Sequence, residues 1–374
     1  MNEWLSARSI LAVRLDNAGD VIMLGPALRA IKETSPEARL TLLASPSGSM
    51  AAPLLPWVDD VITARALWQD LGTLSFSPER ERELIARLRG QFDAAFIFTS
   101  FSQSPHAAAY ACYLAGIPLR AGDSKEFGGS TLSLAVDFLS DEMHQSERAC
   151  RLVEAAGFTV RDRDLSICLP DLQNSSKQLL PTARLDPNQP FVIIHPGASA
   201  EARRYPAPKF GAAARLLTQA GVQVLVTGVE KERPLVDEVL DLAPAAHGFP
   251  RPLSMAEFAS LVGAAAAVVC NNSLPLHLSE ATRTPVVVMF SGTDLEPQWA
   301  PRATPLAVLR RPTPCTPCYR FSCPIGTACL DVEPQSVVKA VMGLFDSAAP
   351  RALRTTVKPQ RPVAMASVGL GVPL

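Results

Sequence analysis

Short apolar runs alternate with amphipathic stretches along residues 9–156. The runs at 9–13, 39–44 and 92–98, with a weaker one at 58–62, predict buried parallel strands. Between and after them, apolar positions spaced three or four residues apart predict helices at 20–33, 78–89, 105–115 and 143–156. This alternation predicts a doubly wound α/β domain.

A second alternating series follows a stretch rich in Pro, Asn and Ser. It predicts strands at 191–194, 222–227, 265–270 and 285–290, and helices at 207–220, 231–242 and 275–282. We therefore expect an N-terminal domain over 1–172, a linker over 173–190 and a C-terminal domain over 191–346, with the ligand in a cleft between two Rossmann-like domains. Residues 347–374 carry four basic and no acidic or aromatic residues, which predicts a flexible tail.

Composition and charge narrow the class of protein. With 48% hydrophobic and 19% charged residues, the chain is able to bury sizeable cores. A net charge of −1 provides no basic field to hold nucleic acid, so we expect no nucleic-acid partner. The N-terminus lacks the pattern of a secretory signal, which favours a cytoplasmic protein. The long uncharged stretch at 258–279 contains two Asn, a Pro and a His, which argues against a membrane span.

A polar segment joins the first predicted strand to the first predicted helix. It contains Asp16, Asn17, Gly19 and Asp20, and in a doubly wound sheet such a turn faces the ligand crevice. Gly19 permits close approach of a ligand, and the N–H groups of the helix suit an anion. Asp20 has two interpretations: an acid that stabilises the helix N-terminus, or a base that deprotonates an acceptor hydroxyl. The spacing alone favours the first.

Two adjacent arginines follow the first strand of the second series. The segment runs from His195 through Gly197 and Ala198 to Arg203 and Arg204. Guanidinium groups bind phosphate oxygens through paired hydrogen bonds, so this turn suits a diphosphate. The alternative is a solvated basic loop.

A third polar segment separates the strand at 265–270 from the next helix. It contains Asn272, Ser273 and Leu274, and His277 lies one turn inside the helix. Amide and hydroxyl groups beside a helix N-terminus are able to bind sugar hydroxyls and phosphate. His277 has the alternative of a structural histidine packed within the helix.

Taken in order, the three segments resemble glycosyltransferase family 9, the bacterial heptosyltransferase family of lipopolysaccharide core assembly. The motifs that carry the resemblance are R-x-D-x-x-G-D at 14–20, H-P-G-A at 195–198 with the basic pair and Tyr205-Pro206, and N-N-S-x-P-x-H-L at 271–278. Residues 25–30 and 284–293 also match family segments, and the family often carries a segment similar to 315–329. The resemblance covers roughly residues 8–342.

The resemblance implies a GT-B enzyme that transfers a sugar with inversion and without a metal or other cofactor. The usual donor is ADP-heptose, and the acceptor is a lipid-linked saccharide at the cytoplasmic face of the inner membrane, whose surface the enzyme would contact. Asp20 would be the general base, with Asp16, Asn17 and Gly19 on the acceptor side. The implied donor-binding residues are Gly197, Ala198, Arg203 and Arg204 at the diphosphate, Glu230 at the nucleoside, Leu253 at the base, and Asn272, Ser273, Leu274 and His277 around the sugar and phosphates.

One departure from the family leaves alternatives open. Many heptosyltransferases have D-[TS]-G where this chain has Asn272-Ser273-Leu274. Asn is neutral, and Leu replaces a glycine whose value is close backbone approach. The alternatives are a GT-B transferase that uses a different nucleotide sugar for another glycoconjugate, and a non-catalytic nucleotide-sugar-binding protein.

Two further groups of residues bear on metal binding. Cys315, Cys318, Cys323 and Cys329 provide four soft ligands within fifteen positions. Their spacing leaves open a structural zinc or iron–sulfur site and a surface loop of reduced thiols. The only D-x-D sequence, at 162–164, falls near the predicted linker and is interpreted as a solvated turn.

Overall fold

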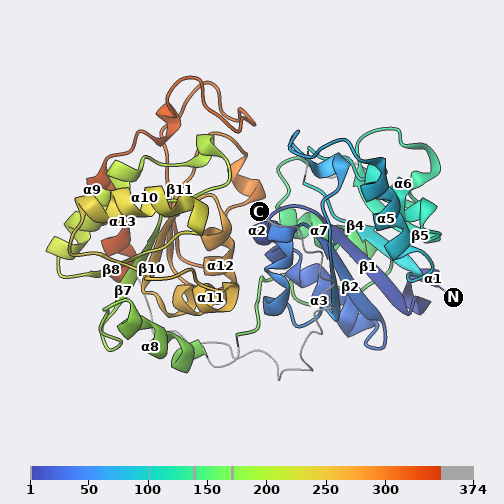
Figure 1. Ribbon diagram of the computed structural model, residues 1–374, viewed down its shortest axis with the longest axis horizontal. Coiled ribbons are helices and arrows are strands. Elements are labelled where there is room, and N and C mark those ends of the chain that lie inside the picture. Colours follow the sequence, from blue (N-terminus) through green and yellow to red (C-terminus); the bar gives the residue numbers. More distant parts are fainter. Residues whose placement is uncertain (1, 101, 138–139, 170–171, 347–374) are drawn as a thin grey trace. The chain divides into compact units, whose positions relative to one another are not determined.

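The computed structural model describes residues 2–100, 102–137, 140–169 and 172–346, which form two compact units that divide between residues 163 and 164. Each unit contains a six-stranded sheet flanked by helices (Figure 1). All described strand pairings are parallel. The predicted tail at 347–374 lies outside the described residues.

The first unit has the strand order of a doubly wound sheet. Its sheet runs β3-β2-β1-β4-β5-β6. The strands are β1 (Ser9–Arg14), β2 (Arg39–Ala44), β3 (Asp60–Thr63), β4 (Ala94–Ile97), β5 (Leu119–Ser124) and β6 (Leu134–Asp137). The helices are α1 (Glu3–Ser6), α2 (Ala18–Ile22), α3 (Gly25–Thr34), α4 (Pro46–Ser49), α5 (Pro78–Leu88), α6 (His106–Leu114) and α7 (Gln145–Ala155).

The second unit repeats that topology, since its sheet runs β12-β11-β10-β7-β8-β9. The strands are β7 (Phe191–His195), β8 (Gln223–Val226), β9 (His247–Gly248), β10 (Ala267–Asn271), β11 (Val286–Met289) and β12 (Leu306–Leu309). The helices are α8 (Leu172–Thr182), α9 (Ala207–Gln219), α10 (Arg233–Leu242), α11 (Met255–Ala264), α12 (Leu274–Thr282) and α13 (Pro334–Asp346). The predicted α/β class with two Rossmann-like doubly wound domains is confirmed.

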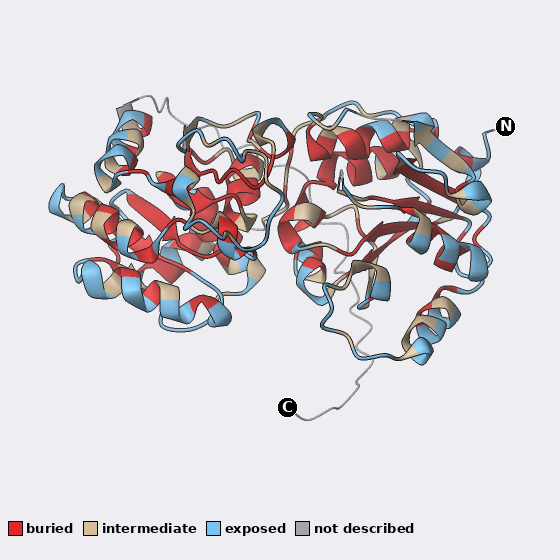
Figure 2. Cartoon of the chain, turned by 90° about the horizontal axis from the view of Figure 1, so that it is seen from above, coloured by how far each residue is buried: buried red, intermediate tan, exposed pale blue. Residues whose placement is uncertain are grey.

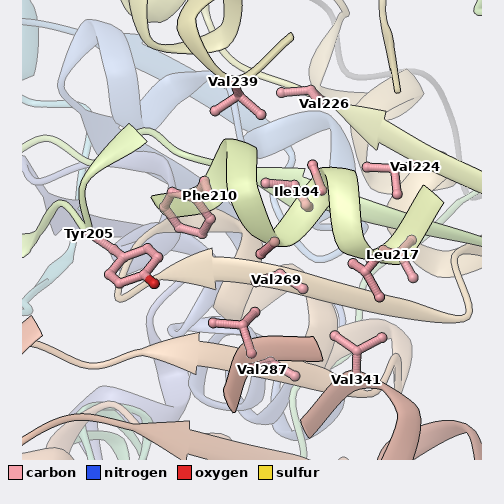
Figure 3. Packing of buried hydrophobic residues seen from close by; sticks show 14 of the residues in the cluster. Ile194, Tyr205, Phe210, Leu217, Val224, Val226, Val239, Val269, Val287 and Val341 are labelled. Atoms are coloured by element: carbon pink, nitrogen blue, oxygen red, sulfur yellow. The ribbon is translucent and has the colours of Figure 1, made fainter. Parts of the chain in front are cut away.

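The central strands are buried on both faces, as their continuous apolar runs predict. All residues of β4, β7 and β10 are buried, whereas helices such as α5 and α10 have exposed outer faces (Figure 2). In the second unit, Ile194, Phe210 and Val269 belong to one apolar cluster that joins the sheet to α9 and α13 (Figure 3). Tyr205 packs edge-on against Phe210, with ring centroids 4.9 Å apart. The core therefore anchors the loop that carries the arginine pair.

Two predicted elements differ from the structure. The predicted helix at 20–33 is divided into α2 and α3, because Pro26 occupies the first turn of a new helix. The predicted linker at 173–190 largely consists of α8, which packs against α11 of the second unit. Leu179 and Leu180 are buried there, so this polar-looking segment is part of the fold.

Within the described ranges, no helix is both long enough and apolar enough to cross a bilayer. The uncharged stretch at 258–279 is divided among α11, β10 and α12, which places its apolar residues inside the second unit.

Candidate functional site

The carboxyl end of β1 holds a buried arginine between two carboxylates. Arg14 Nε lies 2.9 Å from Asp16 Oδ2, and Arg14 Nη2 lies 3.2 Å from Asp20 Oδ1. Arg14 Nη2 also donates to Ser100 Oγ at 3.0 Å, beyond the end of β4. The Arg14 side chain is 3% exposed, so its charge is compensated inside the protein. This ion-pair group lies at the carboxyl ends of β1 and β4, between which the strand order reverses. Ligands of doubly wound sheets bind at such switch points.

Asp16 is held by side-chain amides as well as by the arginine. Its Oδ1 accepts hydrogen bonds from Gln69 Nε2 at 2.6 Å and Gln103 Nε2 at 2.7 Å. Burial raises the pKa of Asp16, an effect that the Arg14 charge opposes and the Asp20 charge reinforces. Asp16 is thus a fixed structural partner of Arg14 rather than a solvated acid.

The position of Asp20 is compatible with both a helix-stabilising acid and a general base. It lies in the first turn of α2, where its Oδ2 accepts the Asn17 N–H at 3.2 Å. Its side chain nevertheless remains 17% exposed and lines a pocket of the first unit. Gly19 is buried inside α2 and Asn17 is exposed. The carboxylate is therefore oriented by the helix and by Arg14, yet accessible from the pocket.

In the second unit, Asn271 fixes the loop that follows β7. Its Oδ1 accepts the Tyr205 N–H at 2.9 Å, and its Nδ2 donates to Pro196 O at 2.8 Å. Ser273 Oγ donates to Gly197 O at 3.4 Å. These bonds join the carboxyl ends of β7 and β10, at the switch point of the second sheet. Asn271 is fully buried, so its role is to hold the loop.

Gly197 is required by a close approach. A Cβ atom at this position would lie 2.1 Å from the carboxyl carbon of Glu232. Glu232 is buried, and its Oε2 lies 3.4 Å from His195 Nε2. Burial alone would raise the pKa of Glu232, but the hydrogen bond and charge of His195 and the Val229 N–H lower it overall. The glycine therefore permits a carboxylate–histidine contact directly beneath the loop.

The two arginines have different partners. Arg203 Nε donates to Thr293 Oγ1 at 3.3 Å, and its Nη2 pairs with Asp294 at 2.9 Å. Arg204 Nε donates to Ala198 O at 2.9 Å. Both side chains are half-buried, so they are held by the fold and remain in part accessible. Asp294 is a partner that the sequence pattern did not predict.

His277 is buried in α12 near the arginine pair. It is 4% exposed, and its Nδ1 has no hydrogen-bond partner among the described residues. Its ring centroid lies 6.1 Å from that of Trp299. Burial, together with the charge of Arg203, lowers the pKa of His277 from 6.5 to about 4. The imidazole is therefore neutral at neutral pH and offers a nitrogen that the fold does not use.

This low pKa predicts a loss of stability in acid. Between pH 6.5 and 4 the unfolded chain binds the proton that folded His277 excludes, so stability falls as pH falls, by about 3 kcal/mol in full. We expect His277→Gln to remove this contribution to the pH dependence of the free energy of unfolding. Urea unfolding at pH 7 and pH 5 measures it, with His247→Gln as the matched control. If the free energy of unfolding depends on pH equally in wild type and His277→Gln, the acid destabilisation does not come from His277.

Glu230 and Leu253 line one pocket of the second unit. The pocket lies beyond the end of β8 and also includes Arg233, Phe249 and Arg251. Glu230 is exposed and Leu253 is half-buried, so both are accessible to a ligand. The structure thus brings together the two residues that the resemblance assigned to the nucleoside and its base.

The remaining predicted donor residues begin α12. Leu274 is its first residue and is half-buried, whereas Asn272 is 3% exposed at the preceding turn. Pro275 occupies the first turn, so the helix N-terminus is well formed without glycine. Leu274 therefore fits the helix, although its side chain occupies space that a glycine would leave open.

The four cysteines of the 315–329 loop are not gathered into one cluster. No group of three or more His, Cys, Asp or Glu side chains within the described ranges is placed to hold a metal ion. All eight cysteines are free. Cys329 Sγ accepts the Gly292 N–H at 3.3 Å, and Cys323 Sγ accepts the Thr327 N–H at 3.2 Å. At least two sulfurs of the loop thus accept backbone N–H groups, and the zinc or iron–sulfur site and the loop of reduced thiols remain the two interpretations of its spacing.

The loop supports the arginine site through its backbone. Cys318 N donates to Gly292 O and Tyr319 N to Thr293 O, each at 2.9 Å. Ala202 N donates to Phe321 O at 2.9 Å. The loop is thereby attached both to the segment that carries Asp294 and to the turn that carries Arg203.

The D-x-D sequence likewise forms no cation site. Asp162 Oδ2 pairs with Arg29 Nη2 at 3.1 Å, and Asp164 Oδ2 pairs with Arg283 Nη2 at 2.6 Å. Each carboxylate is thus compensated by its own guanidinium group.

Two parallel sheets with the same strand order, each with polar residues at its switch point, define an α/β protein of the GT-B class. The solved structure of the E. coli ADP-heptose lipopolysaccharide heptosyltransferase II has this fold. It superposes with a TM-score of 0.71 at 20% sequence identity, covering 91% of this chain and 99% of that one.

Residues 82–328 match the family model described as glycosyltransferase family 9 (heptosyltransferase), and the chain belongs to that family. It is 25% identical to lipopolysaccharide heptosyltransferase 2 of Escherichia coli K12, over 79% of this chain and 86% of that protein. It is 23% identical to lipooligosaccharide heptosyltransferase 2 of Haemophilus influenzae, over 81% of this chain and 88% of that protein. The protein is a glycosyltransferase of the heptosyltransferase family of lipopolysaccharide core biosynthesis.

Proposed function

We propose that this enzyme transfers a heptose from ADP-heptose to a lipid-linked saccharide of the lipopolysaccharide core, with inversion and without a metal. It would act in the cytoplasm, at the inner face of the membrane that carries the acceptor. The observation that carries the proposal is the accessible Asp20 carboxylate at the switch point of the first sheet, oriented by Arg14 and by the Asn17 N–H.

Asp20 would act as the general base. As the acceptor hydroxyl oxygen bonds to the anomeric carbon, its proton passes to the Asp20 carboxylate and the bond from that carbon to the diphosphate breaks. ADP then leaves with the electron pair of that bond. Arg14 holds one carboxylate oxygen and the Asn17 N–H the other, so the group is positioned before the acceptor binds.

The second unit would stabilise the leaving diphosphate. Arg203 keeps its Nη1 without a hydrogen-bond partner among the described residues, and Arg204 keeps both terminal nitrogens. The N-terminus of α12 and neutral His277 add hydrogen-bonding groups around the same ligand. These fixed charges and dipoles supply the electrostatic stabilisation that a metal gives in other transferases.

The pocket beyond β8 would hold the adenosine. The Glu230 carboxylate suits ribose hydroxyls, and Leu253 and Phe249 provide apolar surface for the base. We expect Glu230→Gln to raise the dissociation constant of ADP about tenfold, because a charged hydrogen-bond acceptor is lost. Isothermal titration calorimetry measures this effect, with exposed Glu238→Gln on α10 as the control. Equal affinities in both variants would remove Glu230 from the site.

A nucleotide screen tests the proposed donor. ADP and ADP-heptose are expected to raise the melting temperature, whereas UDP and GDP are expected to give much smaller shifts. Chelation by EDTA should leave both binding and turnover unchanged. A stronger response to UDP or GDP would favour the transferase with a different nucleotide sugar, which the Asn272-Ser273-Leu274 sequence keeps as the second candidate. Binding of ADP-heptose without turnover would favour a non-catalytic nucleotide-sugar-binding protein.

A further inference from the structure

A buried carboxylate contacts both turns on which the proposed donor site depends. Glu232 is 6% exposed and ends the short helical turn Glu230–Glu232, directly before α10. Its Oε2 accepts the Val229 N–H at 3.0 Å and lies 3.4 Å from His195 Nε2. One carboxylate oxygen therefore joins the turn that follows β8 to the end of β7.

His195 is itself held on both sides of its ring. Its Nδ1 lies 3.1 Å from Oγ1 of Thr227, the residue that follows β8. The ring also packs against Phe258 of α11, with centroids 5.5 Å apart. Because both ring nitrogens have partners, the imidazole cannot turn without losing one of them. The contact with Glu232 thus reaches a side chain of fixed orientation at the start of the loop that follows β7.

Glu232 lies behind the donor site rather than in it. The pocket beyond β8 is lined by Val229 and Glu230, but by neither Glu232 nor His195. Glu232 also lies directly beneath Gly197, where the absence of a side chain leaves room for its carboxyl group. Any effect of Glu232 on a bound nucleotide is therefore exerted through the two turns.

The charge of Glu232 strengthens its contacts with both turns. Burial would raise the pKa of its carboxyl group, but the hydrogen bond and charge of His195 and the Val229 N–H lower it overall, so the group is charged at neutral pH. Hydrogen bonds to a charged acceptor are stronger than those to a neutral one. A buried carboxylate–histidine pair nevertheless adds little net stability, because the loss of hydration offsets much of the attraction. Its main consequence is geometric, since it holds the two turns at a fixed separation.

This separation matters to a ligand that has two ends. Gly197 and Ala198 belong to the turn expected at the diphosphate, and Glu230 borders the pocket expected to hold the nucleoside. A ligand that joins two groups gains the full affinity of both contacts only when the spacing of the subsites matches its own. A residue that fixes the spacing therefore controls the affinity of the joined ligand.

We propose that Glu232 is a positioning residue of the donor site, which holds the turns at Gly197 and Glu230 at the spacing of a nucleoside diphosphate. The inference rests on the proposed function and deepens it, because it identifies a residue that governs donor affinity without contacting the donor. Loss of Glu232 should weaken binding of the intact nucleoside diphosphate more than binding of its separate nucleoside and diphosphate parts.

Glu232→Met tests the inference, since methionine preserves side-chain length and helix propensity but removes the charge and both oxygens. We expect the dissociation constant of ADP, measured by titration calorimetry, to rise about 30-fold. The dissociation constants of adenosine and of pyrophosphate, measured by ligand-observed NMR, should each rise less than about threefold. Glu232→Gln keeps an oxygen that accepts the Val229 N–H, so its ADP affinity should stay within about threefold of wild type.

Glu232→Asp is the second variant, because it keeps the charge but shortens the reach of the carboxylate, and Thr284→Val is the control. Thr284 Oγ1 donates to Val262 O at 2.8 Å, before β11, so its loss should lower the melting temperature without changing the ratio of ADP to adenosine affinity. The inference is overturned if both Glu232→Met and Glu232→Asp bind ADP as wild type does. It is also overturned if ADP and both fragments weaken by the same factor.

Hydrogen exchange separates this inference from the proposed function. Without nucleotide, the Val229 amide of Glu232→Met should exchange about tenfold faster than that of wild type, because it loses its acceptor. Mass spectrometry of peptides that cover 195–198 and 228–232 measures the exchange, which should increase in both turns. If wild type binds no ADP, the proposed donor is refuted, and the exchange still decides whether Glu232 holds the turns. Unchanged exchange in both turns would overturn the inference.

Discussion

Asp20→Asn is expected to lower kcat by about three orders of magnitude, because the transferred proton loses its acceptor. The amide keeps an oxygen that can accept the Asn17 N–H, so α2 retains its N-terminal hydrogen bond. Arg14 retains its ion pair with Asp16. Donor affinity should therefore stay within about twofold of wild type, since the donor residues belong to the second unit. Steady-state kinetics measures the loss of kcat, and calorimetry of ADP binding measures any change in donor affinity.

A carboxylate at the amino ends of the strands of the same sheet provides the control for Asp20. Asp93 precedes β4 and accepts the N–H groups of Arg8 and Ser9. Asp93→Asn is expected to reduce stability without changing kcat per folded molecule. If Asp20→Asn keeps more than about a tenth of the wild-type kcat, the base assignment fails. A comparable loss in Asp93→Asn would show that the effect belongs to folding.

Arg203→Ala is expected to raise the dissociation constant of ADP-heptose about 30-fold through the loss of charged hydrogen bonds to the diphosphate. The variant also leaves Asp294, which is 7% exposed on its side chain, without its guanidinium partner. Repulsion between this carboxylate and the diphosphate adds to the loss. Asp294→Asn in the Arg203→Ala background should therefore recover part of the affinity.

Exposed Arg215→Ala on α9 is the matched control for the loss of one positive charge. Its effect on ADP-heptose affinity should be close to zero at physiological salt, because an exposed charge at a distance is screened. An unchanged dissociation constant in Arg203→Ala, measured by calorimetry in the same buffer, would exclude Arg203 from the diphosphate site.

The parts of the fold that apolar periodicity determines were predicted from the sequence. Strands such as β1, β7 and β10 are continuous apolar runs, so the position of Asp20, Arg203 and Asn272 in the segments that follow these strands was predicted from the pattern. The Glu230 and Leu253 pocket was available only through the resemblance, since neither residue has a distinctive local pattern.

Elements whose burial depends on tertiary partners were not predicted. β5 contains Arg120 and Asp123, which do not suit an apolar strand. Arg120 is buried because its guanidinium donates to the carbonyls of Ile117, Pro118 and Thr131, and Asp123 because it pairs with Arg148. Hydrogen bonds between distant segments satisfy these groups, and no local pattern encodes them.

The set of site residues predicted from the sequence was incomplete for the same reason. Asp294 lies 91 positions from Arg203 in the sequence, and the motif that contains it gave no sign of the ion pair. For the cysteine loop the sequence left two interpretations open, and it did not reveal that two of the sulfurs accept backbone N–H groups.

We propose that this family 9 glycosyltransferase uses ADP-heptose, and a transfer assay with a panel of donors provides the sharpest test. Purified protein would be incubated with delipidated core oligosaccharide and, separately, ADP-heptose, UDP-glucose, UDP-N-acetylglucosamine and GDP-mannose. Mass spectrometry would then record the product, with Asp20→Asn as the inactive control. We expect a mass increase of one heptose with ADP-heptose alone, which EDTA does not prevent and which is absent with Asp20→Asn. Transfer from another donor, or none from ADP-heptose, would contradict it.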